Sequence, residues 1–154
     1  MEDLAFVSLH PNDGRFEAQI SLDGVLQMKD DPESALGFAS RVYEASIRRM
    51  RKILTEIDNK RASRSLVPAR AVWRLGDAIW GLTEKLAGRG VQVDGLYGHL
   101  CRDLGVKRKW LEKGVIFRRY IPDMRMIPHT LNWGRCEKGT RRSAERIAQG
   151  LTLD

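Results

Sequence analysis

The strongest constraint on the fold is an apolar stripe that runs through residues 32–59. Apolar side chains recur there every seven residues, and a second register lies beside them. Asp31 and Pro32 are typical of a helix start, because a carboxylate caps the first turn and proline fits it. We therefore predict one helix from Pro32 to about Asn59, about 40 Å long at the usual rise per residue.

A stripe of this length is expected to pack along another long helix. We take it as the interface of a homodimer; the alternative is that the helix lies across its own domain. The residues of the stripe are Leu36, Tyr43, Ile47, Met50, Leu54 and Ile57.

The segment before this helix has the pattern of β structure. A short apolar run, Leu4–Leu9, ends in turn-forming residues. Residues 16–22 alternate between apolar and polar, which is typical of a half-buried strand. A two-residue hairpin signal, Asp-Gly, then leads to Val25–Met28. We predict a small antiparallel meander at the N-terminus.

A second helix is predicted from Leu66 to about Ala87, after a polar and basic linker, Asn59–Ser65. The expected fold class is therefore mainly α with a small N-terminal antiparallel β meander (α+β). Residues 1–60 would form a dimerisation arm of meander and long helix. Residues 66–154 would form a C-terminal helix-turn-helix-like module.

The helix-turn-helix pattern lies in residues 94–120. The first helix of such a unit needs a small residue where the second helix crosses, and Cys101 stands there. The turn needs a left-handed backbone, which Gly105 adopts at no steric cost. The second helix is expected at Lys107–Tyr120. A plain helical hairpin is the alternative. Apolar residues that would lock the two helices together are Leu100, Leu104, Val106 and Leu111.

Charge is spread unevenly along the chain. The net charge is +7, but residues 1–46 carry −6 and residues 47–154 carry +13. A basic region of this size suits a polyanion such as DNA, although it could also be a solvated surface. The N-terminal part of a second helix usually meets base edges in the major groove. The candidate DNA-binding residues are Lys107, Arg108, Lys109, Glu112, Lys113, Arg119, Arg135, Lys138, Arg141 and Arg142.

Residues 70–149 resemble the helical N-terminal domain of the YhcG-like prokaryotic proteins. The residues that carry the resemblance are Trp73, Gly76, Ile79, Tyr97, Gly98, Leu100, Leu104, Leu111, Phe117–Pro122, Leu131 and Trp133. The resemblance implies an all-helical, helix-turn-helix-like domain that binds DNA and belongs to mobile elements or genome defence. In that family a nuclease-like domain usually follows. This sequence leaves no room for one, so nuclease activity is not expected.

No pattern in the sequence points to catalysis or to a metal. A phosphate-binding glycine loop with its lysine is missing, and the histidines and cysteines lack zinc-like spacing. His99 and Cys101 would point about 200° apart on a helix. Asp77 and Glu84 are best interpreted as solvated helix charges. We expect no enzyme, no cofactor and no metal.

Location follows from what the sequence lacks. No stretch approaches the roughly 18 consecutive apolar residues that a membrane helix needs, and the first residues do not form a signal peptide. Two cysteines fit a reducing compartment. We expect a cytoplasmic, nucleoid-associated protein with no membrane partner.

Together these patterns predict a sequence-specific or architectural protein that binds double-stranded DNA. A repressor or a partition-type factor of a mobile element or defence system would use this design. One alternative is a non-enzymatic assembly subunit that docks a protein partner through Trp73, Trp80, Trp110 and Trp133. Another is an RNA-binding adaptor.

Overall fold

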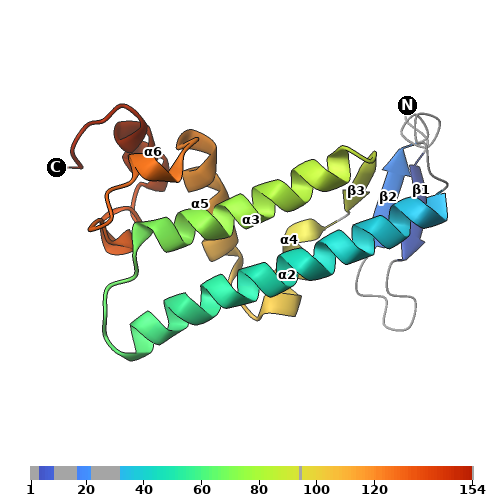
Figure 1. Cartoon of the computed structure of the whole chain (residues 1–154), viewed down its shortest axis with the longest axis horizontal. Helices are drawn as coiled ribbons and strands as arrows, with labels where there is room; N and C mark the ends of the chain where they lie inside the picture. The colour runs from blue at the N-terminus through green and yellow to red at the C-terminus, as the bar shows by residue number, and fades with distance from the viewer. Residues whose placement is uncertain (1–3, 9–16, 22–31, 94, 154) are drawn as a thin grey trace. The chain divides into compact units, whose positions relative to one another are not determined.

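The computed structural model describes residues 4–8, 17–21, 32–93 and 95–153, and this part of the chain is mainly helical (Figure 1). Its α-helices are α2 (Pro32–Ala62), α3 (Ala69–Ala87), α4 (Leu96–Leu104), α5 (Arg108–Tyr120) and α6 (Thr140–Ala148). Two short 3₁₀ helices, η1 (Met124–Met126) and η2 (Trp133–Arg135), lie between α5 and α6. The short strands are β1 (Leu4–Ser8), β2 (Glu17–Ser21) and β3 (Val91–Val93).

The predicted fold class, mainly α with a small N-terminal antiparallel β meander (α+β), is wrong in its meander: the described chain is mainly α-helical, and three consecutive N-terminal strands are not found in it. The short strands pair antiparallel in the order β1-β2-β3, with Ile20 of β2 opposite Val91 of β3. The third strand therefore comes from the segment after α3. The expected third strand, Val25–Met28, lies outside the described residues. A two-stranded hairpin is marginal alone, and local turn signals do not reveal which distant segment extends it.

Two compact units divide the chain. Unit 1 comprises Met1–Arg48 and Gly81–Val106, and unit 2 comprises Arg49–Trp80 and Lys107–Asp154. The boundary passes through α2 and through α3, so each unit is discontinuous in sequence. We describe each unit by itself. The expected division by role, with a dimerisation arm at 1–60 and a DNA-binding module at 66–154, stays a prediction.

Unit 1 has a small core around α4. Ala39, Leu82, Leu86 and Leu100 are buried there. The hydroxyl of Tyr43 donates a hydrogen bond to the carboxylate of Asp103, so the buried phenol has a polar partner. The guanidinium of Arg89 lies 4.2 Å from the ring centre of Phe38.

Unit 2 is organised by a close crossing of α3 and α5. Gly76 of α3 faces Gly114 of α5, and a Cβ added at Gly76 would lie 1.9 Å from the carbonyl oxygen of Gly114. Only two glycines allow the helix backbones to approach so closely. Phe117 packs edge-on against Trp133, with ring centres 5.4 Å apart. The indole Nε1 of Trp73 donates to the carbonyl of Ile121 at 2.9 Å.

The expected dimer interface on α2 is also corrected. Tyr43, Ile47, Met50, Leu54 and Ile57 are all buried within their own chain, with exposed fractions between 0 and 8 %. The side chain of the sixth residue, Leu36, lies outside the described set. A seven-residue repeat indicates that one helix face is buried, but it does not indicate whether the same chain or a second chain covers that face.

The predicted turn at Gly105 is confirmed as a backbone feature. Gly105 has φ 66° and ψ 36°, which is the left-handed conformation, and its N–H donates to the carbonyl of Cys101 at 2.8 Å. The second helix begins at Arg108 after the extended residue Lys107, and it ends at Tyr120 as expected. Because α4 belongs to unit 1 and α5 to unit 2, helix-turn-helix packing stays a prediction.

Candidate nucleic-acid interface

Basic charge is concentrated in unit 2. This unit contains 20 Lys and Arg against 8 Asp and Glu, a net charge of +12, whereas unit 1 contains 7 against 12, a net charge of −5. A cationic unit of this size attracts polyanions over distances comparable to the Debye length. The question is therefore which of its cations gather on one accessible surface.

The first gathering point is the start of α5. Lys107, Arg108 and Lys109 are all exposed, the first turn holds no acidic residue, and the side chain of Lys107 makes no capping hydrogen bond. The N-terminus of a helix carries partial positive charge from its aligned peptide dipoles. Cations are therefore unfavourable here for the helix itself, and an external anion would relieve the repulsion.

The second gathering point is the start of α6. Gly139 precedes it with φ 72°, and the first turn again holds no acidic residue. The hydroxyl of Thr140 donates backwards to the carbonyls of Cys136 and Glu137 at 3.0 and 3.1 Å. Arg141 and Arg142 are exposed in this first turn, so α6 repeats the arrangement of α5.

Two contacts join the region around the start of α6 to the middle and the end of α5. The Nζ atom of Lys113 on α5 donates to the carbonyl of Glu137, just before α6, at 2.9 Å. The guanidinium of Arg141 on α6 lies 5.2 Å from the ring centre of Tyr120 on α5. We call the resulting patch the α5–α6 basic surface. Its residues are Lys107, Arg108, Lys109, Lys113, Lys138, Arg141 and Arg142.

A rigid apolar layer supports this surface from below. Leu111 and Phe117 of α5 and Ile147 of α6 are buried, and Trp133 packs against both Phe117 and Trp110. Cys136 lies in the same layer, and burial raises the pKa of its thiol to about 11. The thiol is therefore neutral at physiological pH and packs as a small apolar side chain.

Ion pairs hold some of the predicted cations. Arg108 pairs with Glu112 at 2.7 Å, and Arg141 pairs with Glu145 at 3.1 Å, each one helical turn away. The hydrogen bond from Glu145 raises the pKa of Arg141 above its ordinary value. Exposed pairs of this kind contribute little to stability, so a phosphate can replace the carboxylate. Glu112, predicted as a DNA contact, instead holds Arg108 in place.

Two predicted residues lie apart from the surface. Arg119 is exposed in the last turn of α5, at the opposite end of the helix from Lys107, Arg108 and Lys109. Arg135 is exposed at the end of η2 and lines a separate cavity.

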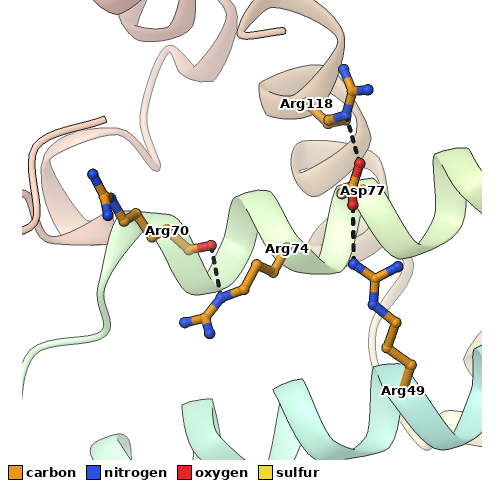
Figure 2. A network of polar contacts seen from close by, with 5 residues as sticks. All are labelled: Arg49, Arg70, Arg74, Asp77 and Arg118. Atoms are coloured by element: carbon orange, nitrogen blue, oxygen red, sulfur yellow. Dashed lines mark hydrogen bonds and ion pairs between the residues drawn. The ribbon is translucent and has the colours of Figure 1, made fainter. Parts of the chain in front are cut away.

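A partly buried polar network in unit 2 is the feature that sequence reasoning missed (Figure 2). Asp77 of α3 accepts from Arg118 of α5 at 2.9 Å and from Arg49 of α2 at 3.0 Å. Arg118 also lies 5.3 and 5.0 Å from the ring centres of Trp73 and Trp80. The expectation that Asp77 is a solvated charge is therefore wrong.

The electrostatics of Asp77 follow from these partners. Partial burial raises the pKa of its carboxyl, but the hydrogen bonds and charges of Arg118 and Arg49 outweigh that effect and lower the pKa overall. Both carboxylate oxygens are engaged, so the network stabilises the unit. Arg118 and Asp77 are 41 positions apart, and no local spacing signals such a pair.

The tryptophans do not form the docking surface that the assembly alternative needs. Trp73 and Trp133 are only 9 % and 3 % exposed. Trp80 and Trp110 are half-buried, and each lies against an arginine, Trp80 against Arg118 and Trp110 against Arg61. Their rings are occupied by contacts within unit 2.

Among the described residues no group of three or more His, Cys, Asp or Glu side chains is arranged to hold a metal ion. In the same part of the chain, no helix combines the length and the apolar character needed to cross a bilayer.

No protein-family model, curated protein or solved structure matches this chain. The resemblance of residues 70–149 to the YhcG-like proteins therefore stays a prediction.

Proposed function

We propose that the chain binds double-stranded DNA through the α5–α6 basic surface, as a repressor or partition-type factor of a mobile element or defence system. The observation that carries the proposal is that unit 2 contains two helix starts that have neither a side-chain cap nor an acidic residue in the first turn. The Lys113–Glu137 contact joins α5 to the residues just before α6. Backbone N–H groups and cations at such positions are suited to phosphate oxygens.

The arrangement favours a phosphate backbone over an isolated anion. Lys107 and Lys109 at one helix start, and Arg141 and Arg142 at the other, are several exposed cations within the same unit. Each cation that neutralises a phosphate releases counterions, so affinity falls as salt rises. Arg108 and Lys109 would also reach base edges if α5 enters the major groove, because the N-terminal part of such a helix approaches the bases.

A homodimer stays part of the proposal, without an assigned interface. Two copies would read two half-sites one helical turn apart. The α2 stripe is buried in its own chain and so does not supply the contact.

The test measures binding of a labelled 20-base-pair duplex by fluorescence anisotropy between about 50 and 200 mM salt. We expect log K to fall linearly with log salt, with a slope near −0.9 for each phosphate contact. The double variant Lys109→Glu/Arg142→Glu should lose at least about tenfold in affinity and show a shallower slope.

The matched control is Lys52→Glu/Lys85→Glu, which makes the same change in net charge. Both lysines are exposed, and neither lies on the α5–α6 basic surface. If both double variants lose the same affinity for the duplex, the loss reflects net charge alone, and the assignment of the surface is overturned. Tighter binding of single-stranded or structured RNA than of duplex would favour the adaptor alternative. Absence of binding at about 50 mM salt would exclude nucleic acid as the binding partner.

A further inference from the structure

A cavity of about 540 Å³ lies in unit 2, in a segment that the DNA proposal does not use. Its walls come from the connection between η1 and η2, from α6, and from residues 150–153. The C-terminal segment is held in place, because the N–H of Leu151 donates to the carbonyl of Arg146 at 2.9 Å. Arg146 Nε in turn donates to the carbonyl of Thr152 at 2.6 Å. Ordered backbone thus forms one wall.

Six of the eleven residues that line the cavity are apolar. Met126, Leu131, Ile147 and Leu151 are among them. Met126 and Leu151 are 42 % and 48 % exposed, which makes them two of the three most exposed large apolar side chains among the described residues. Drug-sized and metabolite-sized ligands occupy cavities of about 300–1,000 Å³ with mainly apolar walls. A ligand with an apolar body would remove both side chains from water.

The polar part of the lining determines which polar group the ligand should carry at its other end. Arg135 supplies a positive charge, and Asn132 and Thr130 add an amide and a hydroxyl. A guanidinium binds a carboxylate through two parallel hydrogen bonds, which gives both affinity and orientation.

We propose that this cavity binds a small amphipathic carboxylate, with its alkyl chain against Met126, Leu131 and Leu151 and its carboxylate at Arg135. The proposal assigns Arg135 to ligand binding and removes it from the predicted DNA contacts. It does not depend on DNA binding, because the α5–α6 basic surface contains none of these residues.

The test uses decanoate as the probe and isothermal titration calorimetry as the readout, with the full chain. Decanol and decyltrimethylammonium have the same alkyl chain with a neutral or a positive end. We expect saturable one-to-one binding of decanoate and a rise in melting temperature with ligand concentration. Decyltrimethylammonium should bind at least about tenfold more weakly, because its charge opposes that of Arg135.

Two variants distinguish the contribution of the carboxylate from that of the alkyl chain. Arg135→Gln should weaken decanoate about tenfold and leave decanol unchanged. Leu151→Asp should weaken both probes, because it places a carboxylate in the apolar wall. Leu66→Asp is its matched control, since Leu66 is 72 % exposed and does not line the cavity. Both Asp variants change exposed positions, so both are expected to fold.

Three outcomes would overturn the proposal. The first is equal affinity for all three decyl probes, which would indicate adventitious hydrophobic binding. The second is decanoate binding that Leu151→Asp leaves intact. The third is the absence of saturable binding, which would leave the cavity to a protein partner or to water. Duplex binding that fails in the salt titration would not bear on any of these results.

Discussion

The two compact units differ in charge and in the aromatic residues that they contain. Unit 1 carries −5 and has no tryptophan in its sequence, whereas unit 2 carries +12 and contains all four tryptophans. Excess charge of one sign destabilises a compact state through self-repulsion. Unit 2 offsets this with arginines stacked on Trp73, Trp80 and Trp110, and with a backbone-to-backbone helix crossing. An excess of positive charge that destabilises the folded unit through self-repulsion is expected where a polyanion binds.

The largest effect should come from the helix crossing in unit 2. Gly76→Ala places a Cβ 1.9 Å from the backbone of Gly114, so α3 and α5 must separate. We expect a loss of about 3 kcal/mol in the free energy of unfolding. Urea denaturation followed by circular dichroism measures it.

Gly81→Ala is the matched control on the same helix, in unit 1, where an added Cβ meets no atom within 4 Å. It should stabilise the chain by about 0.5–1 kcal/mol, because alanine favours the helix. Similar changes in the free energy of unfolding for the two variants would contradict the conclusion that the close helix crossing is particular to unit 2.

A smaller effect is expected from the Asp77 network. Asp77→Asn removes the charge that faces Arg118 and Arg49, and should cost about 2 kcal/mol at pH 7. In the folded protein the pKa of Asp77 lies below its ordinary value of 3.8. The contribution of the carboxylate is therefore complete above about pH 4, and it is lost as the pH falls through the lowered pKa.

Urea midpoints of both proteins between pH 7 and pH 2.5 measure this dependence. The two curves should converge at the acid end. A constant separation between them would show that the substitution acts through packing and not through charge.

Tyr43→Phe tests unit 1 in the same way. It removes the hydroxyl that donates to Asp103 and should cost about 1 kcal/mol. Hydrogen exchange should become faster in α4, with α5 and α6 unaffected. Faster exchange in all three helices would mean that the two units unfold together.

The smallest effect is the response to salt. Raising the ionic strength from about 50 to 500 mM screens the repulsion in unit 2. We expect slower hydrogen exchange in exposed turns of α5 and α6, and no such change in α4. Equal responses would show that the uneven charge has no energetic consequence.

Local sequence signals predicted local structure well. The start of α2 at Pro32, the end of α3 at Ala87 and the left-handed Gly105 all follow from capping, proline and glycine preferences. The end of α2 lies at Ala62, a few residues beyond the predicted Asn59, because basic residues continue a helix as readily as they form a linker.

Long-range partners could not be predicted. The periodic stripe showed that one face of α2 is buried, yet Met50 and Ile57 turned out to lie against their own chain. The pairing of β2 with β3 joins residues about 70 positions apart. The Asp77–Arg118 pair and the contact between Lys113 and Glu137 also join residues far apart in the sequence, so they could not be predicted either. Such contacts depend on how elements cross in space, which spacing along the chain does not encode.

The glycine pair at positions 76 and 114 has a consequence for any attempt to redesign this protein. Because main chain touches main chain there, side-chain rotamers have little influence on the angle at which α5 leaves α3. Residues on the outward side of α5 can therefore be randomised without tilting the helix. A selection experiment on Lys109 and its neighbours would sample new chemistries on a fixed scaffold, and differences in affinity could be attributed to the substituted groups alone.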